Sequence, residues 1–95
     1  MNDINFTPGM LVRVSNWIGV VLDVFQSSTS NQKVVKINFV KNVYKQQPPE
    51  LHIVEDIQPI LSVVTIEDFN SEIERYERMK EKELAALREK LTVAA

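Results

Sequence analysis

The stretch PGMLVRVSNWIGVVLDVF, from Pro8 to Phe25, decides the fold class of this chain. It contains a short apolar alternation, a break at Ser15-Asn16 and a second, longer alternation. Alternating residues point to opposite faces of a β-strand, so the pattern predicts two strands joined by a tight turn. Gly19 lies inside the second alternation and predicts a bulge or sharp bend. Such a bend would let a short sheet curl into a small β-barrel.

Three more strands are predicted downstream. The polar segment Gln26–Gln32 is a predicted hairpin loop, and Lys33–Val40 is the strand that follows it. A turn at Lys41-Asn42 and a strand over Val43–Gln47 come next in the prediction, and Pro48-Pro49 interrupts the sheet because proline donates no ladder hydrogen bond. The last predicted strand is Leu51–Ile57, either whole or giving way to one helical turn. The expected common faces are Ile18, Val20, Leu22 and Val24 in one strand, and Val35, Ile37 and Phe39 in the next.

The sequence changes character at Thr65. From there to Leu91 it has no glycine or proline and is rich in helix-forming residues. Thr65 and Asp68 resemble a capping box, in which each side chain bonds the other's backbone N–H. The prediction is therefore mainly β with a C-terminal α-helix: a five-stranded SH3-like small barrel over residues 1–63, then one long charged helix over residues 64–95. The apolar stripe of that helix comprises Ile66, Phe69, Ile73, Tyr76 and Met79, then Leu84, Leu87 and Leu91.

Composition limits the classes of function. The chain has 95 residues, 44% of them hydrophobic and 25% charged, which fits one domain with a single small core. It has no cysteine, so no disulfide framework or thiolate site is expected. Its first ten residues do not resemble a secretory signal, and no apolar run approaches the roughly 18 residues of a membrane span. We expect a soluble, cytoplasmic protein that does not enter a membrane.

No catalytic constellation is present in the sequence. His52 is the only histidine, and Glu55 and Asp56 are adjacent, so on a strand they would point to opposite faces. Two glycines are too few for a phosphate-cradling loop. The expectation is a non-enzymatic protein without a cofactor or a metal site.

A mixed basic and aromatic surface is the first candidate binding site. Such a surface offers phosphates a positive charge and bases a stacking partner. The opposing interpretation is a solvated face with edge lysines that discourage aggregation, with the aromatic ring of the turn closing the end of the core. Residues 1–63 hold five basic and five acidic side chains, so no strong positive field supports the site. The candidate nucleic-acid-binding residues are Arg13, Trp17, Lys36, Tyr44 and Lys45.

A protein-interaction module is the alternative function. A partner strand could add to an edge of the barrel, or the helix could pair with a second copy or with a partner helix. The candidate contacts on the helix are Leu84, Leu87 and Leu91. The near-neutral barrel favours this alternative.

The segments FTPGMLVRVSNWIGVVLDV and VVKINFVKNVYKQQPPELHIVEDIQPI carry a family resemblance over about residues 6–60. They are similar to the SH3-like or Tudor-like small barrel at the start of bacterial Swi/Snf-type, RapA-like helicases. The ATPase motifs of that family are absent here. The resemblance implies an accessory domain that helps a larger machine engage nucleic acid or RNA polymerase, so the expected partners are nucleic acid or a protein of a nucleic-acid-processing complex.

Overall fold

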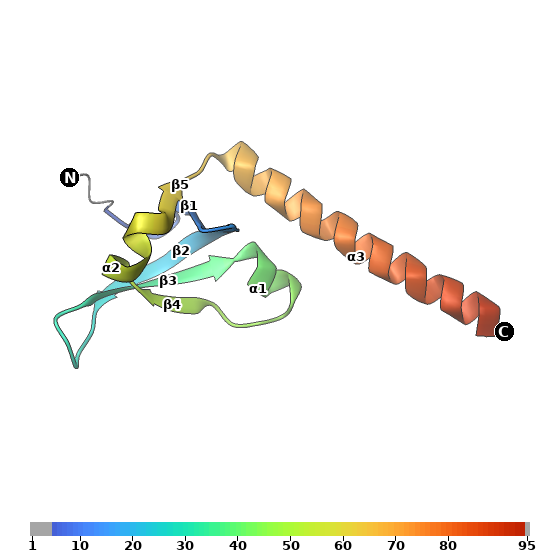
Figure 1. Cartoon of the computed structure of the whole chain (residues 1–95), viewed down its shortest axis with the longest axis horizontal. Helices are drawn as coiled ribbons and strands as arrows, with labels where there is room; N and C mark the ends of the chain where they lie inside the picture. The colour runs from blue at the N-terminus through green and yellow to red at the C-terminus, as the bar shows by residue number, and fades with distance from the viewer. Residues whose placement is uncertain (1–4, 95) are drawn as a thin grey trace.

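A computed structural model describes the backbone of residues 5–94 and the side chains of residues 5–90. It shows a five-stranded antiparallel sheet followed by a long C-terminal helix (Figure 1), which confirms the predicted fold class. The elements are β1 (Leu11–Val14), β2 (Trp17–Gln26), β3 (Lys33–Phe39), α1 (Val40–Tyr44), β4 (Glu50–Ile53), α2 (Val54–Ile57), the 3-10 turn η1 (Gln58–Ile60), β5 (Leu61–Val63) and α3 (Ile66–Ala94).

The strands follow the order β4-β3-β2-β1-β5, so β4 and β5 form the two edges. No hydrogen-bonded ladder joins these edges within residues 5–94, and a closed barrel is therefore not formed by strand pairing. The predicted break at Ser15-Asn16 is the turn between β1 and β2, where Ser15 has a φ of 57°.

The bulge of β2 lies at Leu22, between Val21 and Asp23, and not at Gly19. Because one extra residue reverses the alternation, Val21 and Val24 face the core while Leu22 is exposed. The expected common face of the four apolar β2 residues is therefore wrong. Gly19 has a different role: a Cβ atom there would lie 2.7 Å from the carbonyl oxygen of Asn38, so glycine permits the close approach of β3.

A short helix, α1, replaces the turn at Lys41-Asn42 and the first two residues of the strand predicted over Val43–Gln47, and the remaining residues form a turn and a loop. Val43 and Tyr44 are residue types common in strands, but the buried Val40 and Asn42 hold the segment against the end of the sheet as a helix. Gln46, with a φ of 58°, then reverses the chain toward β4.

Of the two alternatives predicted for Leu51–Ile57, the structure shows the second: the strand β4 ends at Ile53 and one helical turn, α2, follows. The fifth strand is instead β5, which the sequence pattern missed because three residues are too few to show an alternation. Its register comes from β1, where Val12 pairs with Val63 and Val14 pairs with Leu61.

One face of the sheet encloses the core. The expected common face of Val35, Ile37 and Phe39 is confirmed, since all three are buried. They pack with residues of β1, β2 and α2, and the cluster consists of Val12, Val14, Val21, Val35, Ile37, Phe39 and Ile57.

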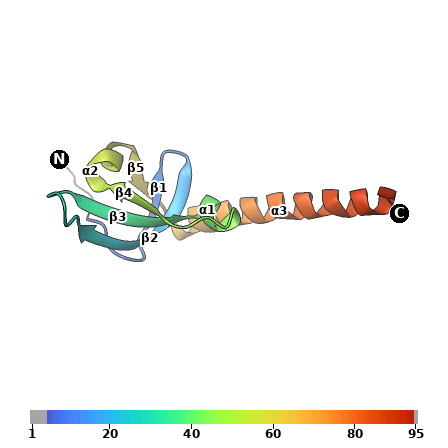
Figure 2. The ribbon, with the colours of Figure 1, turned by 90° about the horizontal axis from the view of Figure 1, so that it is seen from below.

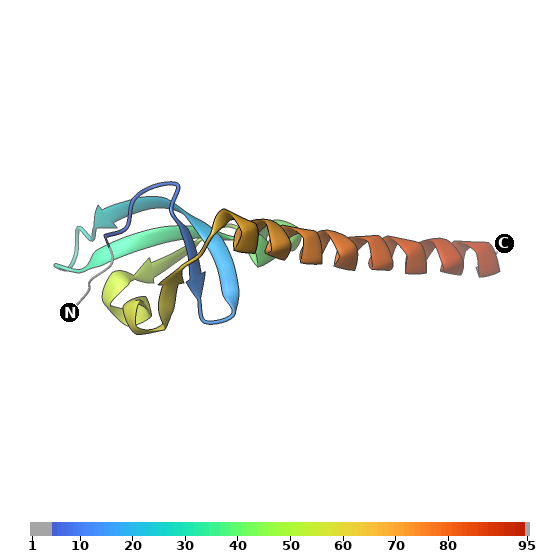
Figure 3. The ribbon, with the colours of Figure 1, turned by 90° about the horizontal axis from the view of Figure 1, so that it is seen from above.

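The long helix α3 lies on the other side of the sheet. Its start has the predicted capping box, because the Asp68 N–H donates to Thr65 Oγ1 at 3.1 Å and the Thr65 N–H reaches Asp68 Oδ2 at 3.5 Å. The first turns contact β2 and α1, and the rest of the helix extends alone into solvent (Figures 2 and 3), giving a molecule 60 Å long. Over the described part of the chain, no helix is long and apolar enough to cross a membrane.

Candidate interaction surfaces

Trp17 opens β2 beside the turn and is 40% exposed. The ammonium nitrogen of Lys41 lies 5.0 Å from the centroid of its ring and 5.5 Å from the centroid of the Phe39 ring. Such distances allow a cation–π interaction, which is strongest on a tryptophan face. The Lys41 ammonium group therefore lies over the Trp17 ring, which also stays partly open to solvent.

Glu50 fixes the position of Lys41. Its carboxylate accepts hydrogen bonds from Lys41 Nζ at 2.7 Å and from Asn42 Nδ2 at 3.0 Å, and it contacts His52 Nε2 at 2.9 Å. These contacts, with that from Lys41 the strongest, lower the pKa of Glu50 to about 2. The histidine ring also meets the Phe39 ring edge-on at 6.1 Å. His52 thus has a structural partner on each side, and the charge of Lys41 is balanced by the carboxylate.

A polar hollow of about 490 Å³ lies between the β1–β2 turn and α3. Here Arg13 and Trp17, both predicted to bind nucleic acid, line one site together. Arg75 lines the same hollow, and its Nε donates to the buried Glu72 at 3.2 Å. Neither Glu72 nor Arg75 was among the predicted binding residues, although their i,i+3 spacing places them side by side on a helix. The lining residues are Arg13, Asn16, Trp17, Ile18, Glu72 and Arg75.

The other three predicted nucleic-acid residues lie elsewhere. Lys36 is in the middle of β3, opposite Asp23 of β2 and Leu51 of β4. Tyr44 packs against α3, and Lys45 follows α1 and ends that helix. The structure therefore places Arg13 and Trp17 in one hollow, which Lys36, Tyr44 and Lys45 do not line.

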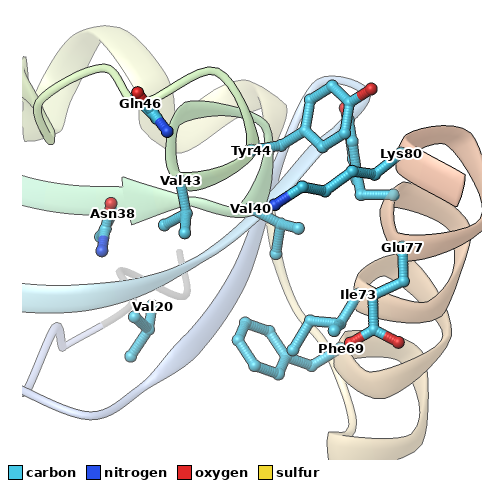
Figure 4. Close-up of a pocket in the computed structure, with 11 residues that line it drawn as sticks. Val20, Asn38, Val40, Val43, Tyr44, Gln46, Phe69, Ile73, Glu77 and Lys80 are labelled. Carbon is cyan, nitrogen blue, oxygen red and sulfur yellow. The ribbon is translucent and has the colours of Figure 1, made fainter. Parts of the chain in front are cut away.

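An apolar groove of about 350 Å³ separates α1 from α3 above the outer face of the sheet (Figure 4). Its α3 wall is part of the predicted stripe, and the rings of Tyr44 and Tyr76 lie 5.1 Å apart across it. Val43 is 60% exposed at its rim. The lining residues are Val20, Asn38, Val40, Val43, Tyr44, Gln46, Phe69, Ile73, Tyr76, Glu77 and Lys80.

The phenol group of Tyr44 lies near Glu83 of α3. A polar contact with the Glu83 carboxylate raises the pKa of Tyr44 above its ordinary value, and burial adds to the shift. This contact does not meet ordinary hydrogen-bond geometry, so the buried Tyr44 hydroxyl lacks a well-formed partner among the side chains described here. The contact shows that α1 lies along α3 as far as Glu83.

Beyond the groove, the stripe of α3 continues without cover from the sheet. Leu84 is 52% exposed and Leu87 is 57% exposed, and Met79 is exposed as well. Leu91 lies on the same helix, but its side chain is outside the described residues. Two of the three partner contacts predicted from sequence, Leu84 and Leu87, are thus exposed on the helix.

Among residues 5–90, no group of three or more histidine and acidic side chains could hold a metal ion. Comparison of the chain with protein-family models, with curated proteins and with solved structures finds no match. The similarity to the helicase barrel therefore rests on the sequence motifs alone.

Proposed function

We propose that this chain is a non-enzymatic protein-interaction module that binds an amphipathic helix. Its binding surface is the exposed stripe of α3 together with the rim of the groove at Val43. The observation that supports the proposal is the continuation of one helix face: Phe69 and Ile73 line the groove, and Leu84 and Leu87 follow on the same side but are exposed. At about 100° per residue, these four side chains fall on one third of the helix circumference.

An exposed leucine stripe on a projecting helix is unusual for a helix that acts alone. Most helical stability in proteins comes from packing an apolar face, and isolated helices are marginal in water. Binding of a second amphipathic helix along a groove is a common solution to this problem. The charged residues that surround the stripe keep it from being a general site of aggregation.

Electrostatics favour a protein partner over nucleic acid. Lys41 is paired with Glu50, and Arg75 is paired with Glu72. The chain carries a net charge of −2. Tight phosphate binding usually needs several uncompensated cations on one face.

The test uses stapled 17-residue helices with leucine at the a and d positions and either lysine or glutamate at the flanking positions. Titration into the isotope-labelled full chain should shift the amide resonances of Val43, Leu84 and Leu87 for at least one charge pattern, with saturation below about 1 mM. Leu87→Glu should abolish the shifts. The matched control Ala86→Glu adds the same charge on the opposite side of α3 and should preserve them. If neither helix shifts these three resonances, the proposal is wrong.

The polar hollow carries a second candidate function, nucleic-acid binding within a nucleic-acid-processing complex. Arg13, Trp17 and Arg75 line it together. The hollow therefore offers a base one aromatic ring for stacking and offers phosphates two guanidinium groups. Anisotropy of labelled duplex and single-stranded DNA at about 50 and 200 mM salt tests it. Binding that weakens with salt and is lost in Arg13→Glu supports this function, and no binding at the lower salt rejects it.

A further inference from the structure

We infer that the helix bound by the exposed stripe of α3 is the same helix of a second copy of this chain, running antiparallel and centred between Ala85 and Ala86. This inference rests on the proposed function, because it names the partner of the same surface. Three features support it: the shape of the molecule, the charges beside the stripe and the open end of the groove.

The shape of the molecule excludes a parallel pair. The stripe faces the side of α3 on which the sheet packs, and beyond α1 the helix extends alone (Figures 1 to 3). In a parallel pair, the two sheets would meet on the same side at the same height and would collide. In an antiparallel pair that overlaps over about residues 80–91, each sheet lies past the last turns of the other helix.

The charges beside the stripe are complementary in the antiparallel register. With Leu84 opposite Leu87 of the second copy, Glu83 lies beside Lys90 of that copy and Glu81 lies beside its Arg88. The two-fold symmetry repeats both pairs. Lys80 is the charged interruption of the stripe, and a parallel pair would bring the two Lys80 side chains together.

The groove provides a place for the end of the second helix. In this register, the last turns of the second copy reach the rim formed by Val43, Tyr44 and Lys80. The exposed Val43 side chain and the open end of the groove then become covered. Each copy therefore both donates a helix end and receives one, and the arrangement closes as a dimer.

Sedimentation equilibrium of the full chain is the first experiment. The contact among described side chains consists mainly of Leu84 and Leu87 from each copy, so a dissociation constant on the order of 10–100 μM is expected. Leu87→Glu should give a monomer, and the control Ala86→Glu should dimerise as the unchanged chain does. A chain that stays monomeric at about 1 mM overturns the inference.

Charge reversal then tests the orientation. Glu83→Lys should raise the dissociation constant roughly ten-fold, since two attractive pairs become repulsive. Adding Lys90→Glu should restore the original value, because the reversed residues face each other in the antiparallel pair. In a parallel pair, Glu83 would instead lie beside Arg88, and the second change would not restore affinity. Lack of restoration overturns the antiparallel register.

A spin-label distance gives an independent measurement. The chain has no native cysteine, so Ser71→Cys places one label on the solvent side of α3. In the antiparallel register, the two labels are separated by about 29 residues of helix, or about 44 Å along the axis. A parallel pair would hold them within about 20 Å of each other.

The outcomes separate this inference from the proposed function. A parallel dimer, or a monomer that still binds the stapled helix, overturns the antiparallel homodimer and leaves helix binding intact. A monomer that binds neither stapled helix overturns both.

Discussion

Replacement of Glu50 by glutamine should destabilise the fold at neutral pH and remove part of its acid sensitivity. The carboxylate holds Lys41, the buried Asn42 and His52 at once. The Glu50→Gln amide keeps the shape but loses the charge, and its NH₂ group cannot accept the bonds that one carboxylate oxygen now accepts. Lys41 would then lie beside the Trp17 ring without its counter-ion.

The magnitude follows from two related quantities, the pKa shift of Glu50 and the burial of Asn42, which donates one of the hydrogen bonds behind that shift. A pKa lowered from 4.5 to about 2 corresponds to at most about 3.4 kcal/mol, since each pKa unit is worth 1.36 kcal/mol. The Glu50 side chain is 34% exposed, so solvent screening reduces this to about 1–2 kcal/mol. The Asn42 amide is 1% exposed, and loss of its charged acceptor costs about 1–3 kcal/mol. We expect a loss of about 2 kcal/mol at pH 7.

The sign of the pH dependence follows from the lowered pKa. The folded state binds the Glu50 proton more weakly than the unfolded chain, so its contribution is complete above about pH 4.5. It is lost as the pH falls toward the folded value of about 2. The stability difference between the unchanged chain and Glu50→Gln should therefore shrink from about 2 kcal/mol to near zero across this window.

Urea unfolding followed by emission of Trp17, the single tryptophan, measures this difference at pH 7, 4, 3 and 2. Glu89→Gln, an exposed carboxylate on the projecting helix and outside the proposed helix contact, is the matched control and should stay within about 0.5 kcal/mol of the unchanged chain. A Glu50→Gln loss below about 0.5 kcal/mol at pH 7, or a difference that does not change with pH, would refute the reasoning.

Three further substitutions test the fold around the two surfaces. Gly19→Ala should cost about 2–3 kcal/mol in urea unfolding, because its Cβ would meet the backbone of Asn38 at 2.7 Å. The comparison variant Gly9→Ala has open space around its Cβ but a φ of 90°, and it should cost only about 1 kcal/mol. Equal losses of stability in the two variants would contradict this account. Thr65→Ala should remove the helix cap and cost about 1 kcal/mol, and unchanged amide exchange in the first turn of α3 would argue against the cap. Tyr76→Ala should release α3 from α1 and cost about 3 kcal/mol of stability, with faster amide exchange over residues 66–80. Amide protection equal to that of the unchanged chain would show that the helix does not depend on this contact.

The amino-acid sequence by itself determined the features that depend on local periodicity. The alternation in Lys33–Phe39 defines a strand with one buried face, and Ser15-Asn16 defines the turn before β2. The spacing of Thr65 and Asp68 defines the start of α3. Each of these features is set by residues within a few positions of one another, so neighbouring side chains are enough to predict it.

Tertiary contacts decided the rest. The segment Val40–Tyr44 contains residue types common in strands but folds as a helix, in which the buried Asn42 donates a hydrogen bond to Glu50, eight positions away. β5 has three residues, too few to show a strand pattern in the sequence, and its register comes from pairing with β1. The bulge at Leu22 lies where β2 changes its register with β3, which no pattern within β2 reveals.

The candidate sites divide in the same way. The leucine stripe of α3 was readable from its spacing, since helix periodicity is local. The separation of Arg13 and Trp17 from Lys36, Tyr44 and Lys45 was not, because it depends on where α1 turns away from the sheet. The pairing of Lys41 with Glu50 also needs the folded chain, since the turn between them brings the two charges within 2.7 Å. Sequence thus specified which side chains each element carries, and long-range packing specified which of them share a surface.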